Sequence, residues 1–487
     1  MDFDHALFHA DLDALPWASY GHAYGSAEDV PGCLRALAGD DDAAADEAQS
    51  ELYGSILHQG SVYEASAKAV PFLARIAAAD IRTADVLLLI GGIAEGGEDP
   101  SPEAGDGPPA EAGDGLPARE SDEVACRRAV VAQLPLLLGA LDHQDRAVRQ
   151  AAAWAAEWTG AAGAAAAVPA LRDREDVEAD PLVRAELLSA LAQLDPEGTA
   201  RAVTEAIGPD GSPPELRIAA LLASADIGLP WTPAHHEAAL ALLPLDRLVA
   251  DRFDHVRNEP LHHLTVTLLL RDTDPDREAV FALLDGALRH PDPEARTEAV
   301  WAALTACELS RGAPARLVGA LTAAAEADGG GAGADSGSGA GHAASGDVSG
   351  ALSALGRLGA YGEPAAELLA TRAAGEGDVA DRALEALVTV DPVRAAPLLA
   401  RDLENRPRAF AAARGGPVGS PGTTPRWTPT SRSPSPCTAS PAKRRKPCRC
   451  WPGCSVTATG SGGAGRSYGL PRRRRAWARR GARSSPY

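Results

Sequence analysis

A short motif recurs along this chain at nearly regular intervals, and it constrains the fold more than any other feature. In each copy an aspartate is followed four residues later by an arginine, which opens a stretch rich in alanine and leucine. The copies are Asp145 with Arg149, Asp180 with Arg184, Asp292 with Arg296, Asp378 with Arg382, and a weaker one in which Pro213 precedes Arg217. Arg149, Arg184 and Arg217 follow one another at intervals of 35 and 33 residues. A period of this size is typical of a helical solenoid, in which each helix pair buries its apolar face against its neighbours.

The segments between these motifs have the chemistry of helices. Leu187, Leu191 and Leu194 fall on one helical face, and Asp-Pro or Pro-Glu pairs precede several apolar stretches. Aspartate caps a helix N-terminus, and proline suits the first turn. No segment combines β-branched residues with an alternation of period two, which is the pattern of a strand. The sequence therefore predicts an all-α fold.

Alternating outer and inner helices, with Asp and Arg at the start of the inner one, resemble the HEAT-repeat family. The resemblance covers about residues 28–405 and is stronger from Asp122 onward. The string His58–Ser66, with Trp17 and Tyr20–Tyr24 upstream, also looks like the start of actinobacterial HEAT-repeat proteins. The resemblance implies a right-handed α-solenoid of HEAT-like antiparallel helix pairs. It also implies that the recurring Asp and Arg residues tie repeats together as a structural ladder, and it brings no reaction with it.

Within each repeat we expect the arginine to pair with the aspartate one turn earlier, a contact worth about 0.3–0.5 kcal/mol on a helix surface. A charged groove for an anionic ligand is the functional alternative for these residues. The charge of the chain argues against that alternative, because the part that carries the repeats is strongly acidic.

Changes of composition along the chain predict five regions. These are an N-terminal entry or cap segment over 1–27, HEAT-like helix pairs over 28–99, a flexible acidic Gly/Pro linker over 100–121, a repeat array over 122–405 with a Gly-rich insert at 329–346, and a disordered basic tail over 406–487.

The charge of the chain is divided between two very different parts. Residues 406–487 hold 18 basic residues and no acidic ones, so residues 1–405 hold 28 basic and 67 acidic residues, a net charge of −39. Because an acidic body is repelled by nucleic-acid phosphates and anionic lipids, we expect a neutral or basic protein partner and no membrane association. The acidic N-terminus and the scattered cysteines before the tail favour a cytoplasmic location.

The basic tail has two interpretations. Taken as written, Lys443–Lys446 and Arg472–Arg475 belong to an arm that binds nucleic acid by neutralising phosphates. The acid-free composition begins, however, where a partner is due for the last predicted helix, Pro392–Asn405. A high-GC gene read in the wrong frame gives such a composition, and we favour this interpretation. Nucleic-acid binding is therefore expected only if the tail is genuine.

Aromatic residues concentrate at the N-terminal end, where the first 72 residues hold eight of the 21 in the chain. Aromatic side chains with polar tips anchor interfaces. A terminal repeat also needs a cap over its outer face, so a cap and a recognition site are compatible interpretations. The candidate partner-binding residues are Trp17, Tyr20, His22, Tyr24, His58, Gln59, Tyr63 and Glu64.

Four potential metal ligands follow one another at intervals of four residues: Asp251, His255, Glu259 and His263. An unbroken helix would align them on one face, as a zinc or iron site requires. Pro260 stands inside the run and would break that helix, which favours a polar segment between helices instead. A metal-dependent enzyme or lyase that uses the His235–His263 segment is the alternative function that these residues leave open.

The sequence contains no coherent catalytic set, and we expect no cofactor. The leading functional prediction is a non-enzymatic HEAT-repeat scaffold or adaptor, which binds a protein partner through its concave surface and its aromatic N-terminal end.

Overall fold

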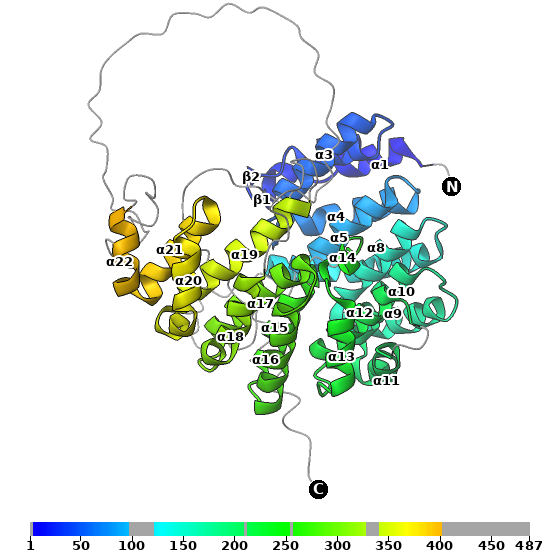
Figure 1. The fold of residues 1–487 in the computed structure, drawn as a ribbon. Coiled ribbons are helices and arrows are strands. Elements are labelled where there is room, and N and C mark those ends of the chain that lie inside the picture. The colour runs from blue at the N-terminus through cyan, green and yellow to red at the C-terminus, as the bar shows by residue number, and fades with distance from the viewer. Residues whose placement is uncertain (1–2, 97–120, 209–211, 254–256, 328–339, 402–487) are drawn as a thin grey trace, which may run out of the picture.

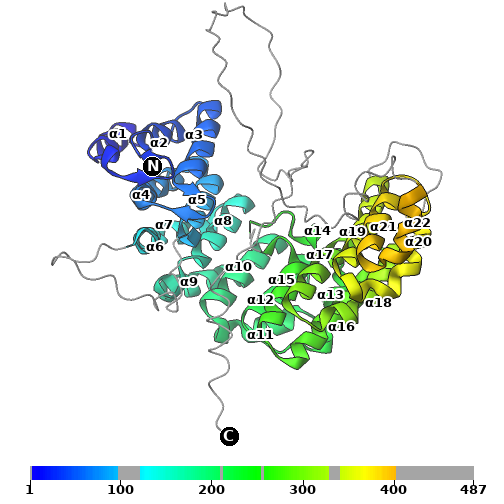
Figure 2. The same cartoon turned by 90° about the vertical axis from the view of Figure 1, so that its left-hand side faces the viewer.

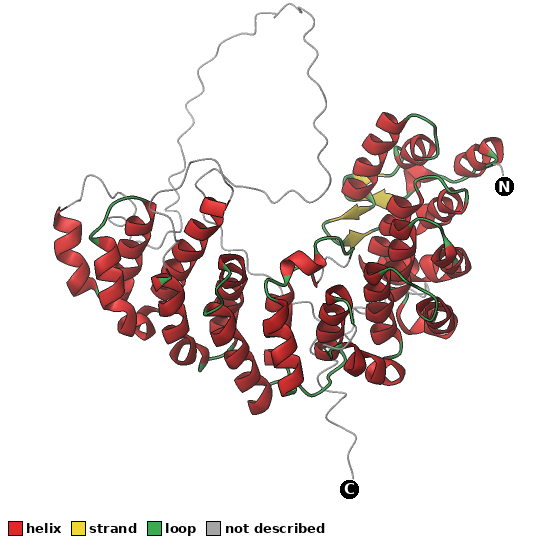
Figure 3. Ribbon diagram, turned by 45° about the vertical axis from the view of Figure 1, so that its right-hand side comes forward, coloured by secondary structure: helices red, strands yellow, loops and turns green. Residues whose placement is uncertain are grey.

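The computed structural model of the chain describes residues 3–96, 121–208, 212–253, 257–327 and 340–401. The predicted basic tail, all but one residue of the predicted linker, and the first part of the predicted insert lie outside these ranges. Over the described residues the chain is an all-α solenoid, which confirms the predicted fold class. Its helices follow one another along an open arc (Figure 3).

The N-terminal part combines helices with two very short hairpins. Its elements are α1 (His5–Asp13), η1 (Trp17–Ser19), β1 (Gly21–His22), β2 (Gly25–Ser26), α2 (Val30–Leu37), α3 (Asp42–Ser55), β3 (Leu57–His58), β4 (Ser61–Val62), α4 (Glu64–Ala78) and α5 (Thr83–Gly96). Both hairpins are antiparallel, with His22 opposite Gly25 and His58 opposite Ser61. Strands of two residues are too short to show an alternating pattern, and for this reason the sequence did not predict them.

The array continues with helices that alternate between two rows. They are α6 (Asp122–Ala132), α7 (Leu134–Gly139), η3 (Ala140–Asp142), α8 (Arg146–Glu157), α9 (Gly160–Glu175), α10 (Pro181–Leu194), α11 (Pro196–Ala206), α12 (Pro214–Asp226), α13 (Pro233–Leu242), α14 (Asp246–Val249), α15 (Pro260–Leu270), α16 (Asp274–Leu288), α17 (Pro293–Leu309), α18 (Ala313–Glu326), α19 (Ala340–Arg357), η5 (Gly359–Ala365), α20 (Ala366–Ala373), α21 (Asp378–Val390) and α22 (Pro392–Arg401). Helix α19 begins inside the segment predicted as an insert, so residues 340–346 are helical.

One row of helices runs through the whole array and carries the recurring motif. This inner row consists of α5, α8, α10, α12, α15, α17, α19 and α21, each of which packs against the next. Contacts are more extensive along this row than along the second row, which includes α16 and α18, as expected on the inside of a bend. The colours in Figures 1 and 2 follow the array from the N-terminal helices in blue to α22 in orange.

Small residues allow the inner row to pack closely. At Gly91 of α5, an added Cβ would lie 2.3 Å from Cζ3 of the buried Trp154 in α8. At Gly92 it would lie 2.5 Å from Cδ2 of Leu57, and at Gly96 it would lie 2.7 Å from the Gly60 carbonyl oxygen. Helix α5 is therefore packed so tightly between α8 and the β3–β4 hairpin that three of its residues have no room for a side chain.

The aspartates of the motif cap helices as predicted, with one exception. Asp145, Asp180 and Asp292 are the N-cap residues of α8, α10 and α17, and each accepts a hydrogen bond from a backbone N–H of the first turn. Asp378 instead lies in the first turn of α21, after Gly377 as the N-cap residue.

The arginines of the motif do something other than what we expected. Arg149 donates to the carbonyl oxygens of His143 and Gln144, and it pairs with Glu178 of the next repeat rather than with Asp145. Arg296 holds the carbonyl oxygens of His290 and Pro291 in the same way. Arg217 donates to a carbonyl oxygen of the preceding loop, that of Ile207. In these three repeats the arginine thus fixes the turn before its own helix, whereas Arg382 pairs with Glu385 in its own helix.

The residue two positions before the capping aspartate also belongs to the motif, although the sequence did not predict it. Two residues before each capping aspartate, His143, Glu178 and His290 accept a hydrogen bond from the backbone N–H of that aspartate. Glu178 also receives Arg149 and Arg174, so it joins two repeats.

No single helix in the described ranges is long and apolar enough to cross a membrane, although the bent pair Asp122–Ala132 and Leu134–Asp142 meets that test by length and composition. The thiols of Cys33, Cys126 and Cys307 are free. Burial is the main cause that raises the pKa of the first two thiols to about 12 and that of Cys307 to about 11, so these thiols stay protonated at neutral pH.

The close approach of Gly91 to Trp154 predicts that an added methyl group at this position destabilises the protein. Gly91→Ala forces Trp154 to move, and we expect it to lower the free energy of unfolding by about 1–3 kcal/mol. The matched control is Gly319→Ala in α18, where an added Cβ meets nothing within 4 Å. It should stabilise the protein by about 0.5–1 kcal/mol, since alanine is the better helix former. Urea denaturation measures both, and equal effects would refute this description of the packing.

Glu178 predicts a dependence of stability on pH. Burial opposes ionisation of this carboxyl, but the hydrogen bonds from Arg149, from the Asp180 N–H and from Arg174 outweigh burial and lower its pKa from 4.5 to about 2. Because the pKa is lowered on folding, the stabilisation is complete above about pH 4.5 and declines as the pH falls toward 2. We expect Glu178→Gln to cost about 1.5–3 kcal/mol at pH 7 and less at pH 3. Urea denaturation of both proteins at pH 7 and pH 3 measures this cost, and an equal loss of stability at the two pH values would contradict the prediction.

Candidate functional site

The exposed tyrosine of the N-terminal end stands on the turn of the first hairpin. Tyr24 is 73% exposed, and its ring meets that of His58, from the second hairpin, edge to face at 5.4 Å between centroids. Its backbone N–H donates to Nδ1 of His22 at 3.0 Å, and Nε2 of His22 donates to Asp29 at 2.9 Å. Nδ1 of His58 donates to the carbonyl oxygen of Gly54 at 2.9 Å. The aromatic ring is thus presented to solvent from a backbone that several hydrogen bonds hold.

Other aromatic candidates belong to the cap. Trp17 is 4% exposed, donates through its indole N–H to the Leu12 carbonyl oxygen, and packs against Phe72. Tyr20 lies edge to face with Trp17, and Nζ of Lys68 sits 5.5 Å from the centroid of its ring. These side chains close the end of the array, which supports the cap interpretation for them.

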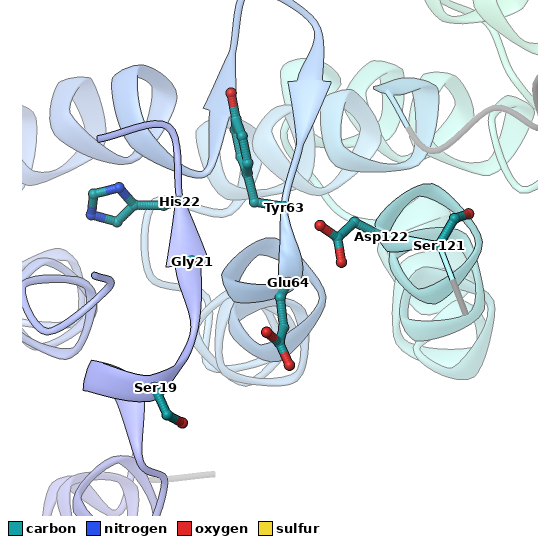
Figure 4. A pocket seen from close by; sticks show the side chains of 7 residues that line it. All are labelled: Ser19, Gly21, His22, Tyr63, Glu64, Ser121 and Asp122. Carbon is teal, nitrogen blue, oxygen red and sulfur yellow. The ribbon is translucent and has the colours of Figure 1, made fainter. Parts of the chain in front are cut away.

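An open hollow of about 550 Å³ lies beside the β1–β2 hairpin. Its lining residues come from η1, β1, the starts of α4 and α6, and the residue before each helix: Ser19, Gly21, His22, Tyr63, Glu64, Ser121 and Asp122. In Figure 4 the carboxylates of Glu64 and Asp122 come from two neighbouring helices and border the same space. Carboxylates in the first turn of a helix are stabilised in the ionised form by the helix dipole. The hollow therefore offers negative charge and hydroxyl groups to a ligand that donates hydrogen bonds.

The eight candidate partner-binding residues thus separate into groups. His22, Tyr63 and Glu64 line the hollow, and Tyr24 contacts His58 beside them. Gln59 is exposed at the tip of the second hairpin, in a left-handed conformation with φ 51°. Trp17 lies in the core and Tyr20 packs against it, so these two are cap residues.

Sequence reasoning missed the far wall of the hollow. Ser121 is the last residue of the predicted linker and Asp122 follows it, and nothing local in the sequence relates them to Tyr63. The pattern Ser121-Asp122-Glu123 does signal a helix N-terminus, and Ser121 caps α6 through the backbone N–H of Val124.

The four metal candidates are not on one helix. Helix α14 ends at Val249, and α15 starts at Pro260, with Glu259 as its non-helical N-cap residue. His255 lies outside the described residues. His263 is buried and its Nε2 bonds Asp226 at 2.8 Å, whereas Asp251 and Glu259 are exposed. Within the described ranges no group of three or more His, Cys, Asp and Glu residues could hold a metal ion.

The segment that carries these candidates does something else: it covers the inner row. We call its described residues, Ala250–Phe253 and Arg257–Glu259, the strap. In α8 every residue from Val148 to Glu157 is buried except the half-buried Arg149. In α10 every residue from Ala185 to Ala192 is buried. Polar residues that face the concave side of a solenoid are normally solvated, yet Gln150, Glu157, Glu186 and Ser189 are at most 4% exposed.

Arg252 is the first anchor of the strap. Its side chain is 1% exposed and pairs with Glu186 of α10, with Nη2 3.0 Å from Oε2. Nη2 also lies 2.8 Å from the Ser189 hydroxyl oxygen. The backbone N–H of Phe253 donates to the same carboxylate at 3.0 Å, and Gln150 of α8 donates to the Asp251 carbonyl oxygen.

Arg257 is the second anchor and joins two further inner helices. Its Nε lies 2.7 Å from Oδ2 of Asp226 at the end of α12. Its Nη1 and Nη2 lie 3.2 and 3.3 Å from Oε1 of Glu157 at the end of α8. Asp226 also receives Nε2 of His263 from α15, so four helices or segments meet in one buried polar network.

A carboxylate of α17 holds the start of α14, just before the strap. Glu298 accepts the backbone N–H groups of Leu245 and Asp246 at 2.9 and 3.1 Å. Burial, reinforced by the charge of Asp246, raises the pKa of Glu298 to about 7. The contacts of α14 and of the strap therefore reach from Glu298 in α17 to Glu157 in α8.

The ion pairs that anchor the strap lie on α8, α10 and α12, which precede α17 in the inner row. The exposed face of α17 includes Trp301, a residue 65% exposed, with the Thr305 hydroxyl 3.3 Å from Nδ1 of His262. Of the predicted concave contact surface, the part over α8 and α10 is therefore covered by the strap.

Comparison with known proteins agrees with this architecture. Residues 118–192, which span α6 to most of α10, match the family model of HEAT repeats. No curated protein matches the chain. The match identifies HEAT repeats in this part of the chain, and the described residues as a whole form a helical-repeat solenoid.

The buried pair of Arg252 and Glu186 predicts that loss of one partner destabilises the protein more than loss of both. Arg252→Met leaves the charge of Glu186 buried without this partner, and we expect the free energy of unfolding to fall by about 3–5 kcal/mol. The double variant Arg252→Met with Glu186→Met should recover most of that loss, because it removes both charges. Urea denaturation of the two single variants and the double variant gives the coupling energy. A coupling energy near zero would show that the pair is not formed.

Proposed function

We propose that this HEAT-repeat protein is a non-enzymatic scaffold or adaptor that binds a neutral or basic protein partner in the cytoplasm. Its N-terminal end is the proposed primary contact surface. The observation that carries the proposal is the pairing of an exposed, firmly held tyrosine with a carboxylate-lined hollow on the same end of the array.

The two parts of this surface suit different parts of a partner. Tyrosine contributes a large apolar area at a low entropic cost, and exposed aromatics of this kind are frequent hot spots of interfaces. The hollow, bordered by Glu64 and Asp122, favours a lysine, an arginine or another hydrogen-bond donor. The net charge of −39 over residues 1–405 steers basic partners toward the protein from a distance.

The covered part of the concave face also supports this choice. A partner cannot reach α8 or α10 from that side while the strap is in place, because their concave faces are buried. The exposed face of α17 around Trp301 remains available as a second contact surface.

Site-specific crosslinking tests the proposed surface. A photoreactive phenylalanine derivative replaces Tyr24 in one variant and Val177, which is 69% exposed after α9, in the control variant. We expect irradiation in the native lysate to give a discrete crosslinked protein from position 24 that is absent from position 177. The yield should fall with Glu64→Gln and Asp122→Asn, because the hollow then loses its charge. No discrete product at position 24, or the same product at both positions, would overturn the proposal.

A further inference from the structure

The covered groove of the inner row has the features of a peptide-binding site that is already filled. Three successive inner helices, α8, α10 and α12, each present a carboxylate to the concave side: Glu157, Glu186 and Asp226. All three pair with the two arginines of the strap, Arg252 and Arg257. In between, Gln150 and Glu186 bond the backbone of the strap, as solenoids do when they hold a peptide.

From this arrangement we infer that the concave groove of α8, α10 and α12 is a recognition site for a segment with two arginines five residues apart, and that the strap occupies it as a built-in ligand. The site goes beyond the proposed adaptor surface at the N-terminal end and does not depend on it. A partner segment of the same chemistry would bind here by replacing the strap.

The geometry selects arginine rather than lysine. Arg257 uses three nitrogens, with Nε on Asp226 and both terminal nitrogens on Glu157. Arg252 divides its donors between Glu186 and Ser189. Only a planar guanidinium offers several donors in fixed directions, whereas an ammonium group is a single point of charge.

The occupant must also be cationic. With the strap in place Glu186 is 0% exposed and Glu157 is 4% exposed, and both are paired with arginines of the strap. A covered groove of this kind favours an occupant that carries matching positive charge over a neutral or acidic one. Phe253, which packs against the apolar core next to Arg252, adds an apolar anchor to the recognised pattern.

A peptide supplied in trans tests the inference. The receptor is the full chain with Arg252→Met and Arg257→Met, and the probe is a fluorescein-labelled synthetic peptide of residues 249–260. We expect fluorescence anisotropy to show saturable binding to this variant. The strap competes in the wild type at a local concentration on the order of 1 mM, so binding should be about 100-fold weaker there. A control peptide with citrulline in place of both arginines keeps the shape without the charge, and it should bind at least about tenfold more weakly.

Two outcomes would overturn the inference: no binding to a double variant that is folded by circular dichroism, or equal binding of both peptides. If the double variant does not fold, the single variant Arg252→Met, which retains the pairs of Arg257, takes its place in the same titration and is judged by the same two outcomes. Crosslinking at Tyr24 reports on a different end of the array, so failure of one proposal is distinguishable from failure of the other.

Discussion

Close packing along the inner row is the constraint on which the rest of this structure depends. Helix α5 contains three glycines and half of the residues of α8 are alanine, and the two helices approach until Gly91 has no room for a methyl group beside Trp154. Small side chains bring the helices together but bury little apolar area each. The array therefore draws additional stability from polar contacts between repeats, such as those of Arg149 with Glu178.

The buried polar network extends the same principle to the concave side. Arg252 and Arg257 connect one chain segment to three inner helices, and each arginine pairs with carboxylates whose side chains are at most 11% exposed. Buried pairs of this kind add less to stability than to specificity, because their desolvation offsets much of the Coulomb attraction. Here they fix the position of the strap, and the strap in turn decides which part of the concave face is open to other molecules.

The sequence predicted correctly those features that depend on residues close together in the chain. The spacing of Asp145, Asp180 and Asp292 predicted three helix starts, and the structure has Asp at the N-cap in each. Pro260 was correctly weighed as the residue that breaks the run of metal candidates, and α15 begins there. These features are local, since capping and proline geometry act within one turn of a helix.

The candidate site was less accessible to sequence reasoning because it is built from distant segments. Arg252 lies 66 residues from Glu186, and Arg257 lies 100 residues from Glu157. No periodicity in the sequence reveals pairs of residues so far apart. In the same way, Asp122 meets the neighbourhood of Tyr63 only because α6 packs on α4.

The central claim is that the strap lies in the groove of the inner row, held by Glu186. Hydrogen–deuterium exchange of the Phe253 backbone amide tests it most directly, because this N–H lies outside any helix and has a buried carboxylate as its acceptor. The account predicts that it exchanges as slowly as the amides in the middle of α10, and that Glu186→Ala accelerates it. Exchange at the rate of an exposed loop in the wild-type protein would contradict the account.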